Sequence, residues 1–69
     1  MKEAVSDAIA LLPVSLREAL ILREYEEYSY QEIAEILNIY ISLAKVRIFR
    51  ARGILRKILT PIHKEIYES

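Results

Sequence analysis

Apolar residues recur at helical spacing along nearly the whole chain. From the N-terminus, this spacing predicts helices at about residues 3–12, 16–26, 30–37 and 43–59. The last helix carries the longest apolar stripe, with members four and three residues apart: Ala44, Ile48, Ala51, Leu55 and Ile58. Because one glycine and two prolines are the only strong helix breakers, the pattern predicts an all-α fold, a compact four-helix domain.

Local sequence signals give the expected ends of these helices. Ser15 and Ser29 each stand three residues before a glutamate, the capping-box arrangement, and Ser42 is a third candidate cap. Asn38 is expected to end the third helix, because asparagine tolerates left-handed backbone geometry. Pro61 has no backbone N–H to donate, so the last helix should end or kink there.

The apolar faces of the four helices predict one shared core. Its expected members are Ile9, Leu12, Leu16, Leu20, Ile33, Ala34, Leu37, Ala44, Ile48, Ala51 and Leu55. Ala34 has a special place in this list, because a small residue there would let the third and fourth helices cross closely.

Length and composition limit the possible functions. A chain of 69 residues is expected to form a single domain over residues 1–69. Without cysteine it has no disulfide or thiol nucleophile, and with one histidine, His63, no metal site or cofactor is expected. No nucleophile or pocket-forming loop accompanies its carboxylates, so we expect neither an enzyme nor a small-molecule substrate. No signal peptide or membrane-spanning run is recognisable, which favours a cytoplasmic protein.

The net charge of zero hides a division along the chain. Residues 1–40 hold three bases and eight acids, a net charge of −5, while residues 41–60 hold six bases and no acid, a net charge of +6. A segment with several basic residues and no acidic ones has no ion-pair partners inside its own helix, so it is suited to binding a polyanion. Two short helices with a tight turn and a basic second helix are typical of a helix-turn-helix, here at about 29–52. In that motif the second helix enters the major groove of DNA.

An idealised helical wheel gives the candidate contacts on the last helix, which lie opposite or beside its apolar stripe. Tyr30 and Gln31 join them because they start the preceding helix, where backbone amides and side chains commonly meet a phosphate. The candidate DNA-binding residues are Tyr30, Gln31, Ser42, Leu43, Lys45, Val46, Arg47, Phe49, Arg50 and Arg52. Lys45 and Arg50 are the best placed for phosphates or bases. Arg47 lies nearest the stripe and has an alternative role, an ion pair with Glu32 or Glu35.

Three segments of the chain resemble a known family. The runs "LLPVSLRE", "YQEIAEIL" and "AKVRIFRAR" resemble region 4, the C-terminal promoter-binding domain of bacterial sigma factors, most closely the extracytoplasmic-function group. The resemblance extends from Ala10 to Leu59. It implies binding to double-stranded promoter DNA at the minus-35 element and to the β flap of the RNA polymerase core. It also allows sequestration by an anti-sigma factor. For the flap, the early helices could supply an apolar groove from Val5, Val14, Leu16, Ile21 and Leu22.

The chain departs from the pattern of this family around the motif turn. The family usually has glycine at Asn38, proline at Tyr40, threonine at Leu43 and serine at Val46. Leu43, Val46 and Phe49 together make the expected contact face apolar, which suits thymine methyl groups or a protein surface. Two alternatives therefore stay open. One is another helix-turn-helix regulator, such as a LuxR-type effector domain. The other is a protein-interaction module that has kept the fold and lost the DNA contacts.

Overall fold

The protein folds into four helices, as the apolar spacing predicts. The structure, a computed structural model, describes the backbone of residues 2–68 and the side chains of residues 4–60. The helices are α1 (Lys2–Ala10), α2 (Val14–Glu24), α3 (Tyr30–Leu37) and α4 (Ile41–Glu68). Residues 2–68 contain no strand, so the all-α prediction is confirmed.

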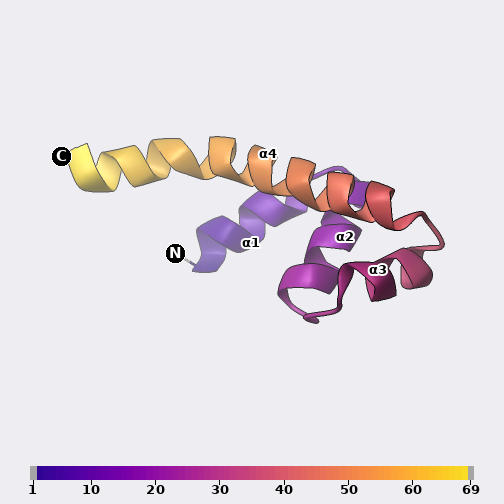
Figure 1. The fold of residues 1–69 in the computed structure, drawn as a ribbon. Helices are drawn as coiled ribbons and strands as arrows, with labels where there is room; N and C mark the ends of the chain where they lie inside the picture. The colour runs from indigo at the N-terminus through magenta and orange to yellow at the C-terminus, as the bar shows by residue number, and fades with distance from the viewer. Residues whose placement is uncertain (1, 69) are drawn as a thin grey trace.

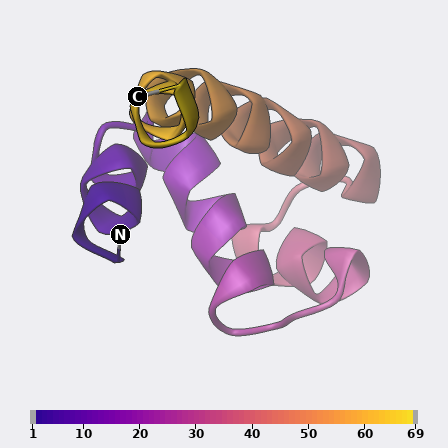
Figure 2. The same cartoon turned by 90° about the vertical axis from the view of Figure 1, so that its left-hand side faces the viewer.

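Helix α4 is the platform on which the other three helices pack. It contacts α1, α2 and α3, and Figures 1 and 2 show it lying along one side of all of them. The predicted stripe makes these contacts, because Ala44, Ile48 and Ala51 are buried. Leu55 and Ile58 are half-buried, since the far part of α4 extends past the other helices in Figure 1.

The core consists of two clusters along α4. One joins Ala19, Ile33, Ala34, Ala44 and Ile48, and the other joins Ile9, Leu12, Leu20 and Ala51. Of the predicted core, only Leu16, Leu37 and Leu55 are half-buried rather than buried, and they still pack against these clusters. Alanines from α2, α3 and α4 meet in the first cluster, so three helices approach closely there.

The ends of α3 follow the sequence signals. The backbone N–H of Ser29 donates to the Glu32 carboxylate over 2.9 Å, and the Glu32 N–H donates to the Ser29 hydroxyl over 3.1 Å. Asn38 adopts the left-handed conformation, with φ 55° and ψ 50°. The Ile39 N–H reaches back to the Ala34 carbonyl over 2.9 Å, which closes the C-terminus of α3. Both predictions for α3 are confirmed.

Two other predicted caps are wrong, because each helix begins before its serine. Pro13 takes the N-cap position of α2, and its carbonyl accepts from the N–H groups of Leu16 and Arg17, which leaves Ser15 inside the first turn. The Tyr40 carbonyl likewise accepts the first N–H bonds of α4, so Ser42 is already helical. A serine caps a helix only where its own backbone is still non-helical and the helix begins at the next residue.

The predicted end of the last helix near residue 59 is also wrong. Helix α4 continues through Pro61 to Glu68. A proline removes one hydrogen bond, here the one to the carbonyl of Lys57. Lys57 is exposed, so water can reach the region of that carbonyl. The helix is already long at that point, and extending an existing helix does not require a new nucleus.

Candidate nucleic-acid interface

The interface is formed by α3 and α4 and the short turn between them. Ala34 is only 7% exposed and Ala44 is fully buried, so the two helices cross at small side chains. Asn38 reverses the chain after α3, and α4 begins at Ile41. This arrangement is a helix-turn-helix, with α4 as its second helix.

The first three turns of α4 expose most of the predicted contact residues on one side. We call this set the outer face: Ser42, Leu43, Lys45, Val46, Phe49 and Arg50. All six are exposed, while Ala44 and Ile48 between them are buried against the core. The structure therefore brings these candidates together on a surface that a partner can reach.

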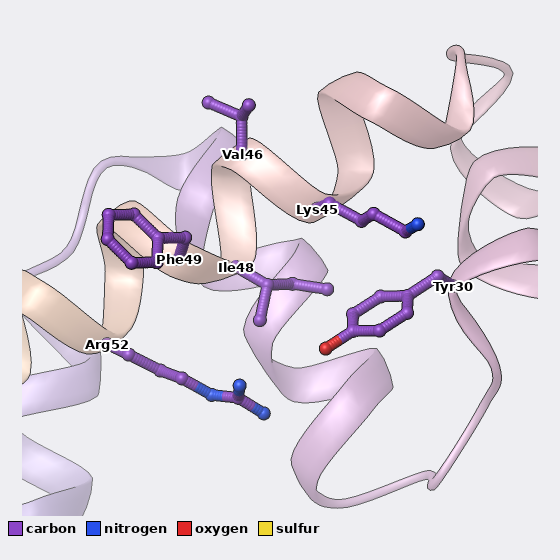
Figure 3. A pocket seen from close by; sticks show the side chains of 6 residues that line it. All are labelled: Tyr30, Lys45, Val46, Ile48, Phe49 and Arg52. Atoms are coloured by element: carbon purple, nitrogen blue, oxygen red, sulfur yellow. The ribbon is translucent and has the colours of Figure 1, made fainter.

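The start of α3 lies next to the outer face. Gln31 is exposed there and Tyr30 is half-buried. The Tyr30 ring has the Arg23 guanidinium 4.5 Å from its centroid and the Lys45 ammonium 5.8 Å away, so it makes cation–π contacts with α2 and α4. Figure 3 shows Lys45 extending toward this ring. Tyr30 thus holds a cation of the outer face close to the N-terminus of α3.

Arg52, on the flank of the outer face, is engaged within the protein. Its Nε donates to Oε1 of Glu24 over 2.9 Å, and its Nη2 also donates to that oxygen. The Glu24 carboxylate raises the pKa of the guanidinium further above its already high value. Sequence reasoning missed this ion pair, because Glu24 lies 28 residues away and on another helix. The only signal for it was the acidic end of α2.

Arg47 does not form the ion pair that we considered as its alternative role. It is half-buried, and among the residues with described side chains the one ion pair joins Arg52 to Glu24. Glu32 instead turns back to the N-terminus of its own helix, where the Ser29 N–H holds it and lowers its pKa. Glu35 is exposed. The base run of α4 therefore keeps most of its charge available to an outside partner.

Other kinds of site find little support in the described part of the chain. Within it, no three His, Cys, Asp or Glu side chains are grouped so that they could hold a metal ion. His63 lies outside the residues with described side chains. No described helix combines the length and the apolar character that a membrane span needs.

Comparison with known proteins gives one consistent result. Residues 2–55 match the model of the family described as sigma-70, region 4. The chain is 40% identical over 65 residues to the RNA polymerase sigma-H factor of Pseudomonas aeruginosa, covering 94% of this chain and 34% of that protein. It is 39% identical over 62 residues to the ECF RNA polymerase sigma-E factor of Haemophilus influenzae, covering 90% of this chain and 33% of that protein.

The sigma-E factor of Escherichia coli is similar as well, at 37% identity over 62 residues, which cover 90% of this chain and 32% of that protein. The chain thus spans about a third of the length of these relatives. Sigma factors are transcription initiation proteins, and the matched family region includes α3, the turn and the first half of α4. The resemblance expected from the motifs is confirmed: the chain belongs to the sigma-70 region 4 family of sigma factors.

Proposed function

We propose that this chain is the promoter-binding domain of a sigma factor, which recognises the minus-35 element in the cytoplasm. One observation carries the proposal: residues 41–60 hold six bases and no acid, and the first half of this run forms the exposed second helix of a helix-turn-helix. Phosphate contacts from such bases supply most of the affinity of a protein for DNA. Family membership favours this function over that of a LuxR-type effector domain.

The proposed contacts divide by chemistry. Lys45 and Arg50 lie on the outer face and meet the duplex most directly, with Arg47 at its side. Arg52 lies on the other side and joins these contacts only when it exchanges Glu24 for a phosphate. Gln31 and Tyr30 stand at the N-terminus of α3, where backbone N–H groups favour a phosphate. The remaining outer-face residues reach toward base edges: Ser42, Leu43, Val46 and Phe49.

The proposed second partner is the RNA polymerase β flap. Between α2 and α3 lies a depression of about 320 Å³, lined by Glu18, Ile21, Leu22 and Leu37. Two members of the groove expected from the sequence, Ile21 and Leu22, line it, and both also pack against the core clusters, as Leu16 does. An apolar flap segment would bury these side chains. An anti-sigma factor would inhibit the domain by covering either this depression or the outer face.

A flap peptide should therefore shift the amide resonances of Ile21, Leu22 and Leu37 in nuclear magnetic resonance spectra. Unchanged resonances in α2 and α3 at saturating peptide would remove this depression from the proposal. Ala10 and Leu11, at the exposed end of α1, provide reference signals that the peptide should leave in place.

DNA binding is tested by fluorescence anisotropy with labelled promoter fragments across a salt series. With three or four phosphate contacts and no dimer, the dissociation constant should be of micromolar order at physiological salt. The Lys45→Ala, Arg50→Ala double variant should bind all fragments more weakly, and its salt slope should shrink by about 2. Lys57→Ala is the matched control, an exposed base farther along the same helix. Salt-insensitive binding that is equal for parent and double variant would favour a protein-interaction module instead.

A further inference from the structure

Two large apolar side chains stand unpartnered on the outer face, one helical turn apart. Val46 is 41% exposed and Phe49 is 78% exposed, and neither belongs to a core cluster. Figure 3 shows Val46 on the side of α4 away from Tyr30, with Phe49 one turn farther along. Neither side chain belongs to the packed core, so fuller burial of either must come from a partner or not at all.

The surroundings of this apolar pair are cationic. Together with Tyr30, Lys45, Ile48 and Arg52, the pair lines an open depression of about 360 Å³ (Figure 3). Among these lining residues Ile48 is buried, Lys45 is an exposed base, and Arg52 is paired with Glu24. Arg50 adds a further exposed base next to Phe49. A fitting partner combines a dense negative charge with small apolar groups.

Duplex DNA offers both features in its major groove. The phosphates carry the charge, and the C5 methyl group of thymine is the apolar group that base pairs present there. Val46 has no hydrogen-bonding atom, so it cannot select guanine, adenine or cytosine by donors and acceptors. Its branched side chain is also nearly fixed in one rotamer on a helix, which makes a contact with a small group repeatable.

We propose that the surface between Val46 and Phe49 is a thymine-methyl contact site, so that this domain selects thymine at one or two promoter positions by apolar contact. The inference rests on the proposed DNA-binding function and adds its base preference. Val46 supplies two methyl groups to this surface. A serine at that place would offer a hydroxyl in place of two methyl groups.

The test replaces thymine by deoxyuridine, one position at a time, in a promoter fragment that the parent binds. This exchange removes the methyl group and keeps the base-pairing edge. At the contacted positions the parent should bind about fourfold more weakly per methyl group removed, with an unchanged salt slope. Val46→Ser should bind the thymine and deoxyuridine fragments equally at the position that Val46 contacts.

Leu11→Ser is the matched control, because Leu11 is also exposed, at 72%, but lies just after α1. It should keep the methyl preference of the parent. Salt-dependent binding with no methyl preference at any position would overturn the inference and leave the proposed function standing. Absence of salt-dependent binding to every fragment would overturn both. Binding of the domain to RNA polymerase can be measured for the same variants. If Val46→Ser weakens that binding and the parent shows no methyl preference, this surface belongs to a protein partner and the inference is overturned.

Discussion

The ion pair between Glu24 and Arg52 leads to a prediction about DNA affinity. Arg52 lies beside the outer face, but its guanidinium is already paired with a carboxylate of α2. If Arg52 is to contact a phosphate, it must first exchange Glu24 for that phosphate. Glu24→Gln removes the competing charge and should therefore strengthen DNA binding.

The size of this effect follows from counterion release. One further phosphate contact adds about 0.9 to the magnitude of the salt slope. If that contact contributes nothing at about 1 M salt, the slope gives an affinity gain of about eightfold at about 0.1 M salt. The fold should persist, because the two side chains are 44% and 47% exposed and such a surface pair contributes only about 0–1 kcal/mol.

The assay is fluorescence anisotropy on one promoter fragment at several salt concentrations. Glu26→Gln is the control, because it removes the same charge from an exposed residue just after α2. Arg52→Ala should change the salt slope little in the parent and by about 1 in the Glu24→Gln background. Equal gains from Glu24→Gln and Glu26→Gln would refute the competition, since long-range charge alone would then explain both. Weaker binding by Glu24→Gln would show instead that Glu24 positions Arg52.

Three further predictions concern stability. Ala34→Leu should lower the free energy of unfolding by about 1–3 kcal/mol through overpacking where α3 crosses α4, and a melting curve equal to that of the parent would disprove the close crossing. Asn38→Val should cost about 1–2 kcal/mol in urea unfolding because φ is 55°, whereas Asn38→Gly should stay near the parent; equal stabilities of the two variants would contradict the left-handed turn. Acid should weaken the fold through Glu32, whose folded-state pKa is lowered by the N–H and hydroxyl of Ser29. This stabilisation is complete above the unfolded pKa and is lost as the pH falls through the folded pKa, so Glu32→Gln should flatten the change in stability between about pH 6 and about pH 3; an unchanged profile would count against the capping box.

Much of the fold could be predicted because local signals and the apolar spacing agree. The stripe on α4 and the capping box at Ser29 each depend on residues within a few positions, and both are observed. The errors at Ser15 and Pro61 came from two local rules, the capping-box pattern and the rule that a proline ends a helix. At Ser15 the rule failed because α2 already begins after Pro13. At Pro61 it failed because α4 is already long when it reaches the proline.

The candidate site could be predicted only as a list of residues, two at the start of α3 and the rest on α4. The helical wheel gives their directions, and the exposed side chains of Lys45 and Arg50 agree with it. A helical wheel cannot predict contacts between helices, because these depend on how far each helix is rotated about its axis and shifted along its neighbour. The pairing of Arg52 with Glu24 and the placement of Lys45 beside Tyr30 are of this kind.

Helix α4 packs on the core and presents an exposed surface, and different residues of the helix serve these two roles. Ala44, Ile48 and Ala51 pack α4 on the core. Val46 and Phe49, which lie between these residues in the sequence, belong to neither core cluster. Substitutions at the second set can therefore change the contact surface without a matching loss of stability. On the proposed function, such substitutions would change the base preference of the domain while the fold persists. A library randomised only at exposed positions of the first three turns should likewise yield mostly folded domains.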